Sequence, residues 1–220
     1  LKRCLVGTVK PLEPGLTWPH PDAWSRVGVM RRKQVAADAH VVVLAAPGPC
    51  PTAVPGSDFA ARGGGVWHVK IRLPGPGARF VVERPYTPLP PSFGALVGDA
   101  APDEVALLVR EYSAKRVASW ALTHAPLQAS AAVDVQAMNP WGYTPTAPPP
   151  PWCSPGVKNV GLVALGTGVA PMLQLLARAL PDEADERVFW LLWVNRDASR
   201  VAFASELRAW VDSFPRGSQR

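Results

Sequence analysis

The chain has few cysteines, few histidines and no long apolar run, and each scarcity excludes a class of protein. Cys4, Cys50 and Cys153 are odd in number, far apart and without a C-x-x-C pair, so we expect neither a disulfide framework nor a zinc site. The histidines are scattered without an H-x-x-x-H pattern, which predicts no metal site of any kind. The longest apolar run, near residues 160–169, is interrupted by glycine and is shorter than the roughly 18 to 20 residues of a membrane helix, so the sequence predicts no transmembrane segment.

Hydrophobic residues make up 48% of the chain, enough for a packed core, while 26 prolines and 18 glycines predict long loops between short elements. The net charge of +6 is dispersed and favours a solvated basic face. The same charge is also compatible with a nucleic-acid-binding surface, an acidic electron-transfer partner, a place in an RNA-rich assembly or import into mitochondria. The cysteine usage fits a reducing compartment. The chain begins with Leu1, as expected after removal of a targeting peptide or after truncation, so the expected location is mitochondrial, with the cytoplasm as the alternative.

Proline divides the chain into units. Four prolines in succession, residues 148–151, form a stiff stretch that is poor in hydrogen-bond donors and is typical of a domain boundary. The predicted units are an extended proline-rich arm over residues 1–22, a β-barrel over 23–143, a proline-rich linker over 144–156 and an α/β domain over 157–220.

The hydrophobic periodicity changes from one side of this linker to the other. Before it, β patterns dominate and predict an antiparallel barrel or sandwich: a strand, a turn and a strand over 27–43, strands over 66–73, 80–82, 105–112 and 133–138, and a short helix over 118–127. Residues 46–65 predict an insertion loop. After the linker, strands and helices alternate and predict a parallel sheet of the nucleotide-binding kind: strands over 160–165 and 188–194, helices over 171–180 and 203–214.

The first chemical motif is Arg84-Pro85-Tyr86-Thr87-Pro88, at the end of a predicted strand. A guanidinium fork suits a phosphate, an aromatic face suits a flat ring, and a hydroxyl group can donate or accept a hydrogen bond. Taken alone, the same residues could equally be a surface ion pair beside a core tyrosine.

The second motif follows about eighty residues later and runs from Gly166-Thr167-Gly168 through Pro171 to Gln174. Glycines between a strand and a helix let a dinucleotide phosphate approach the backbone at the helix N-terminus. Pro171 is expected at the first helical position. The alternative is an ordinary glycine-rich turn between a strand and a helix.

In this order and at this separation, the two motifs resemble the ferredoxin reductase superfamily of flavoproteins, and within it NADH-cytochrome b5 reductase, over roughly residues 25–211. The resemblance implies a β + α/β fold, in which an antiparallel FAD-binding β-barrel precedes a truncated parallel-sheet NAD(P)-binding domain. It also implies an oxidoreductase that passes a hydride from NAD(P)H to FAD, and then electrons to an acceptor protein.

The same resemblance assigns roles in FAD binding. Arg84 would hold the FAD diphosphate, Tyr86 would pack along the ribityl chain or the flavin ring, and Thr87, the expected catalytic residue, would hydrogen-bond near flavin N5. Arg110 and Tyr112 would face the adenine side of FAD, since strand alternation predicts that they share a face. Ser119 matches the serine of a Gly-x-x-Ser turn that binds the diphosphate, but Arg116 stands at the glycine position, where it would replace amide donors with charge or fill the phosphate site.

For the dinucleotide, the resemblance implies binding by Gly166, Thr167, Gly168 and Pro171. Asn195 matches a position near the adenosine ribose, whereas Arg196 departs from the family pattern and leaves the choice between NADH and NADPH open.

A second hypothesis follows from the departures. The first departure is Arg116 at the glycine position. The second is that this sequence contains no Cys-Gly-Pro-Pro motif, whose cysteine lies beside the nicotinamide in family members. The alternative to an active enzyme is therefore a catalytically degenerate, reductase-like pseudoenzyme that serves as a structural subunit of a large multi-subunit complex, such as a mitochondrial one.

Overall fold

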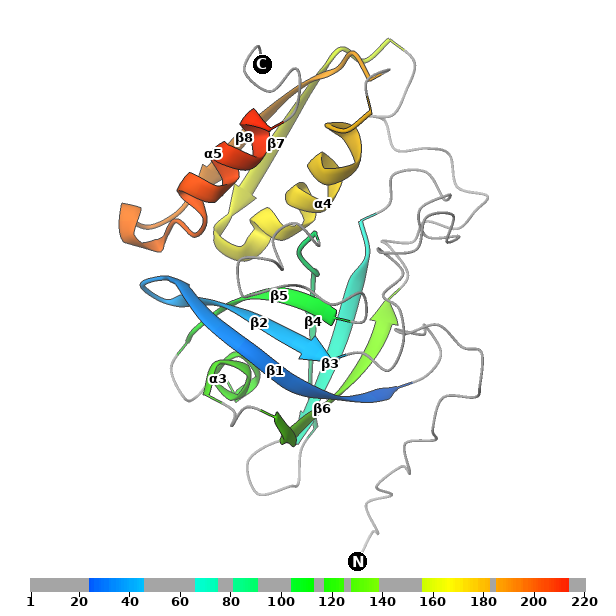
Figure 1. Cartoon of the computed structure of the whole chain (residues 1–220), viewed down its shortest axis with the longest axis vertical. Helices are drawn as coiled ribbons and strands as arrows, with labels where there is room; N and C mark the ends of the chain where they lie inside the picture. Colours follow the sequence, from blue (N-terminus) through cyan, green and yellow to red (C-terminus); the bar gives the residue numbers. More distant parts are fainter. Residues whose placement is uncertain are drawn as a thin grey trace, which may run out of the picture.

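The computed structural model of the chain describes residues 24–45, 66–74, 81–90, 104–112, 117–124, 128–138, 156–182 and 185–213. Within them, an antiparallel barrel lies against a smaller parallel sheet with its helices (Figure 1). The predicted arm, the insertion loop at 46–65, most of the linker and Arg116 lie outside the described residues.

The barrel is a six-stranded antiparallel sheet in the order β4-β3-β6-β1-β2-β5. A bridge between Pro88 and Leu107, with the Leu89 amide donating to the Ala106 carbonyl at 2.7 Å, joins the chain after β4 to β5 and closes the sheet. The predicted antiparallel architecture is confirmed. Its elements are β1 (Ser25–Ala36), β2 (Ala39–Ala45), β3 (His68–Pro74), β4 (Val81–Tyr86), β5 (Glu104–Arg110), α3 (Val117–His124) and β6 (Gln128–Met138).

Strand β2 is apolar on both faces because both faces are covered. Val42 and Leu44 belong to the interior of the barrel, together with Trp67 and Leu107. The alternate residues Val41 and Val43 point outward and are also buried, against the second unit. A strand enclosed on both sides carries a continuous apolar run instead of alternation, which is what residues 41–44 show.

The second unit is a parallel pair of strands with helices on one face, confirming the predicted alternation of strands and helices. Side chains from alternate positions of both strands pack on α4 and α5. The opposite face carries exposed apolar side chains, at Val163, Leu165, Trp190, Leu192 and Val194. The elements are β7 (Asn159–Leu165), η3 (Gly166–Gly168), α4 (Val169–Ala179), β8 (Val188–Val194), η4 (Ala198–Arg200) and α5 (Ala204–Asp212).

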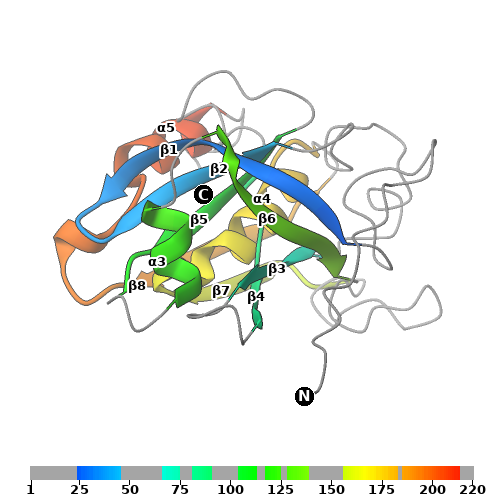
Figure 2. The same ribbon diagram turned by 90° about the horizontal axis from the view of Figure 1, so that it is seen from below.

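One apolar cluster joins the two units. Val41 and Val43 of the barrel pack with Leu173 of α4 and with Phe203, which precedes α5. Figure 2, seen from below, shows the barrel strands in front of α4 and α5. Because the buried surface is shared, the two units hold each other in a defined orientation.

Three local predictions need correction. Helix α4 begins at Val169, so Pro171 is its third residue and not its first; proline is tolerated there because the first four helical amides have no partner within the helix. Strand β4 includes the Arg84-Pro85-Tyr86 motif, because Pro85 lies on an edge strand, where a missing amide costs little. Strand β5 ends at Arg110, so alternation does not extend to Tyr112.

None of the helices in the described part of the chain is long and apolar enough to span a bilayer.

Candidate functional site

The turn between β7 and α4 needs glycine at its first position. Gly166 has a φ of 54°, which places it in the left-handed region that favours glycine. Its carbonyl accepts a hydrogen bond from the Trp193 indole N–H at 2.8 Å, which ties the turn to the next strand. Gly168 has ordinary helical dihedral angles, and a Cβ added there would meet nothing within 4 Å. The space around Gly168 is therefore open to a ligand.

A cavity of about 480 Å³ lies in front of this turn, at the carboxyl ends of β7 and β8. This is the position at which open parallel sheets bind nucleotides, and the volume lies in the range of small-molecule sites. The lining residues are Asp38, Arg110, Glu111, Tyr112, Leu165, Gly166, Thr167, Val194, Asn195, Arg196 and Arg200.

Arg110 links the barrel to the glycine turn. Its Nη2 donates to Asn195 Oδ1 and to the Arg200 carbonyl, each at 3.1 Å, and its Nη1 lies 3.3 Å from where a Cβ on Gly166 would stand. The side chain is only 12% exposed. The predicted Arg110 is thus placed beside the glycine turn, whereas Tyr112, beyond the strand end, is 47% exposed. Both residues nevertheless line the same cavity.

Asp38 neutralises part of this positive charge. One carboxylate oxygen lies 3.4 Å from Arg110 Nε, and the other accepts a hydrogen bond from Arg200 Nη1 at 2.7 Å. Sequence reasoning missed Asp38, in the turn between β1 and β2, and Arg200, at the end of η4, because neither belongs to a motif and they meet only in the tertiary structure.

Asn195 has a donor that nothing in the described structure satisfies. Its Oδ1 accepts from Arg110, which sets the amide orientation, and its Nδ2 is buried without a hydrogen-bond partner. A buried amide donor at the edge of a cavity is suited to a ligand oxygen. The residues present therefore fit a nicotinamide dinucleotide, and the place of Asn195 near the adenosine ribose stays a prediction.

The flavin motif lies at the end of β4. The Arg84 side chain is exposed and donates to the Glu83 carbonyl at 2.7 Å, and no carboxylate among the described residues pairs with it. Tyr86 is half-buried and packs against the barrel core, and this burial raises the pKa of its phenol to about 12. An exposed cationic group and a neutral aromatic ring are thus available on one edge strand.

Thr87 is held by a residue that sequence reasoning passed over. Thr87 Oγ1 lies 2.7 Å from His68 Nδ1, at the start of β3. Burial lowers the pKa of His68 below 6.5, so the imidazole is neutral near pH 7. Among four scattered histidines, nothing local singled out His68; only the pairing of β3 with β4 brings it to Thr87.

Ser119 is buried on α3, where its carbonyl accepts a hydrogen bond from Thr123 Oγ1 at 2.9 Å. Figure 1 shows α3 on the side of the barrel away from α4. The roles in FAD binding that the resemblance assigns to Arg84, Tyr86, Thr87, Arg110, Tyr112, Arg116 and Ser119 stay predictions, as do those of Gly166, Thr167, Gly168 and Pro171 toward the dinucleotide.

Residues 162–219 match the family model of the oxidoreductase NAD-binding domain. Two solved structures share the fold over most of this chain: the CS-b5R domains of human Ncb5or in the NAD⁺ form (TM-score 0.62, 19% identity, 86% of this chain and 48% of that one) and the cytochrome b5 reductase domain of Ulva prolifera nitrate reductase (TM-score 0.62, 20% identity, 90% and 72%). The chain has the ferredoxin reductase-type fold. The resemblance predicted from the two motifs is confirmed at this level.

The sequence similarity to curated relatives covers about a quarter of this chain. NADH-cytochrome b5 reductase 1 of Scheffersomyces stipitis is 37% identical over 59 residues, which are 27% of this chain and 21% of that protein. NADH-cytochrome b5 reductase 3 of Rattus norvegicus is 41% identical over 51 residues, which are 23% of this chain and 17% of that protein. The match thus spans about a fifth of the length of these relatives.

Proposed function

We propose that this chain is an NAD(P)H-dependent flavoprotein oxidoreductase of the cytochrome b5 reductase type. The observation that carries the proposal is the cavity in front of Gly166, which is lined by Asn195 with its unpaired Nδ2. The similarity of residues 162–219 to oxidoreductase NAD-binding domains supports the same conclusion.

The charges around the cavity suit a diphosphate. Arg110, Arg196 and Arg200 line it, against the carboxylates of Asp38 and Glu111, so cationic groups outnumber anionic ones. The helix that starts at Val169 adds the positive end of its dipole at the glycine turn. The dinucleotide phosphates would be held there, with the adenosine ribose toward Asn195.

On the barrel side, Arg84 would hold the diphosphate of FAD, and Tyr86 would pack along its ribityl chain or ring. A bound FAD would supply an acceptor for the hydride of NAD(P)H and a donor of single electrons to two one-electron acceptors, so that each turnover would release one oxidised nicotinamide and one proton.

The His68 and Thr87 pair provides a path for that proton. Thr87 Oγ1 and His68 Nδ1 are within hydrogen-bond distance, and a neutral imidazole can accept a proton at a ring nitrogen. Thr87 would therefore orient its hydroxyl toward the flavin, while His68 would exchange a proton with the Thr87 hydroxyl.

The test uses the full chain, titrated with FAD and then with NADH under anaerobic conditions. Quenching of flavin fluorescence on binding, followed by loss of the oxidised flavin absorbance when NADH is added, is the expected result. Thr87→Val should bind FAD and reduce it more slowly. A chain that binds FAD but is not bleached by either NADH or NADPH would contradict the proposal.

Two observations favour a second candidate, a reductase-like structural subunit without turnover. The Arg110 guanidinium stands against Gly166, where close approach of a phosphate is expected, and Arg116 replaces a glycine of the family pattern. Such a chain would be colourless, would ignore NADH, and would act through a large assembly, such as a mitochondrial one, in place of an electron-acceptor protein.

A further inference from the structure

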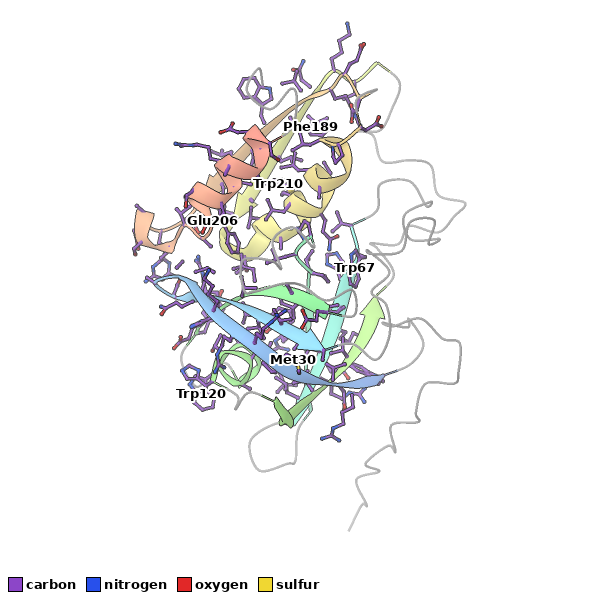
Figure 3. The ribbon with its side chains drawn as sticks, viewed as in Figure 1. Met30, Trp67, Trp120, Phe189, Glu206 and Trp210 are labelled. Atoms are coloured by element: carbon purple, nitrogen blue, oxygen red, sulfur yellow. The ribbon has the colours of Figure 1, made fainter. Side chains whose placement is uncertain are left out.

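A buried amide connects the two units of the molecule. Gln174 on α4 is 6% exposed, and its side chain is fully engaged with the main chain of the barrel. Its Oε1 accepts from the Trp67 amide at 2.9 Å, and its Nε2 donates to the Trp67 carbonyl at 3.2 Å and to the Pro88 carbonyl at 2.7 Å. Figure 3 shows Trp67 at the end of the barrel that faces α4.

Only a carboxamide satisfies this arrangement. One main-chain donor and two main-chain acceptors must be paired, and glutamine offers one oxygen and an NH₂ group in one plane. A glutamate would place oxygens where the two carbonyls accept hydrogen bonds, and a leucine would remove all three hydrogen bonds. The neighbouring side chains Leu173 and Leu89 are apolar and cannot replace it.

The backbone segments that Gln174 contacts also carry His68 and Thr87. Trp67 directly precedes His68, and Pro88 directly follows Thr87, while His68 and Thr87 contact each other at 2.7 Å. Gln174 therefore holds both backbone segments that carry the pair.

On its own helix, Gln174 is connected rigidly to the glycine turn. It lies six positions after Gly168, a distance of about 9 Å along a helix that rises ~1.5 Å per residue. The Gln174 side chain thus connects α4, which starts at the glycine turn, to the segment that holds Thr87.

We propose that Gln174 is a positioning residue that sets the separation between the glycine turn at 166–168 and Thr87. The proposal rests on the proposed function for its catalytic meaning, since this separation would be the gap that a hydride crosses. The apolar cluster between the units keeps them together without Gln174, because apolar contacts are not directional. The amide sets the register, because its hydrogen bonds require defined positions on both sides.

The first test measures the geometry without any ligand. Cys4, Cys50 and Cys153 are replaced by serine, and spin labels are placed on Cys introduced at two exposed positions, Arg26 of the barrel and Arg208 of α5. Gln174→Leu and Gln174→Glu should shift or broaden the distance distribution and remove the hydrogen-exchange protection of the Trp67 amide. Gln34→Leu is the matched control, because Gln34 is exposed and bonds only locally, to the Ala37 carbonyl.

The second test uses the FAD-loaded chain and NADH. Gln174→Leu and Gln174→Glu should keep the affinities for FAD and for NAD⁺ within about threefold, while hydride transfer at saturating NADH falls about 100-fold, the effect of a misplacement of roughly 1 Å. Lowering the pH should partly restore the rate of Gln174→Glu, because a protonated carboxyl can donate to one of the two carbonyls.

An unchanged distance distribution and an unchanged transfer rate in folded Gln174→Glu would overturn the positioning role. So would loss of FAD affinity as large as the loss in rate, which would make Gln174 a support of the flavin site alone. Failure of the wild-type chain to be reduced by NADH would instead contradict the proposed function, and the distance measurement would still decide whether Gln174 positions the two segments.

Discussion

His68 Nδ1 and Thr87 Oγ1 lie 2.7 Å apart, although 19 positions separate the two residues in the chain. The contact forms because β3 and β4 pair with Val69 opposite Tyr86, which places their flanking residues side by side. It joins a residue of the flavin motif to one that no motif contains.

This hydrogen bond should be measurable as a coupling between the two side chains. Thr87→Val, His68→Leu and the double variant form a cycle, and we expect a coupling free energy of about 1 kcal/mol in urea unfolding. A second cycle with Thr123→Val in place of Thr87→Val is the control, because Thr123 bonds to the Ser119 carbonyl on α3. Strictly additive effects of Thr87→Val and His68→Leu would contradict the contact.

Burial of His68 also predicts a pH dependence of stability. Burial lowers the pKa of His68 below 6.5 in the folded state. Between the folded-state pKa and the unfolded-state pKa of about 6.5, the unfolded chain therefore binds more protons than the folded chain. Stability should be complete above pH 6.5 and should decrease as the pH falls through this window. His40, whose pKa is also lowered mainly by burial, contributes in the same direction.

His68→Gln should therefore reduce the slope of unfolding free energy against pH below 6.5, and His40→Gln should remove a further part. The measurement is chemical unfolding at a series of pH values. A slope in His68→Gln as steep as in the wild type would show that His68 is not kept neutral by the fold.

Asp38 restrains the positive charge of the cavity, so its removal should strengthen anion binding. In Asp38→Asn, Arg110 and Arg200 lose a carboxylate partner, and we expect the Kd for ADP-ribose to fall about fivefold, equal to ~1 kcal/mol. Calorimetric titration at low and high salt measures this, with a larger effect at low salt. Asp212→Asn on the exposed end of α5 is the control. Weaker binding by Asp38→Asn would mean that its ion pairs hold the site open.

The glycine turn offers a matched pair of substitutions. Gly166→Ala should cost about 1 to 2 kcal/mol, because φ is 54° and the new Cβ would stand 3.3 Å from Arg110 Nη1. Gly168→Ala should change stability by less than about 1 kcal/mol, since its dihedral angles suit any residue, but should weaken NADH binding by filling the open space. Equal unfolding free energies for the two variants would contradict the backbone assignment.

The same substitution should change the unfolding free energy by different amounts on the two faces of β8. Leu192 is 61% exposed, so Leu192→Thr should alter the unfolding free energy by about 0.5 kcal/mol or less and reduce binding of a hydrophobic dye. Leu191 packs on the opposite face, in the clusters that include α4, so Leu191→Thr should cost about 2 kcal/mol or more. A larger loss from Leu192→Thr would show that this face is covered in solution.

Much of the fold could be predicted from local patterns. The sequence predicts the apolar strand at 188–194 at the bounds that the structure shows, because a run of this length that is rich in aromatic and β-branched residues is typical of a strand and short for a helix. The sequence also predicts the strand and the glycine turn within residues 159–168, since a β run followed by glycines and a helical pattern is typical of a strand-turn-helix unit. The start of α4 at Val169 was missed, because proline within the first helical turn is compatible with several start positions.

What the sequence by itself determined is the type of each element and the two motifs, because periodicity and glycine placement act over a few residues. The tertiary structure alone decided which side chains meet: Asp38 with Arg110 and Arg200, His68 with Thr87, and Gln174 with the main chain of Trp67 and Pro88. Those contacts join residues up to 162 positions apart, and they depend on strand register and on how the two units pack. No local pattern encodes either of these, because both arise from the burial of apolar surface over the whole molecule.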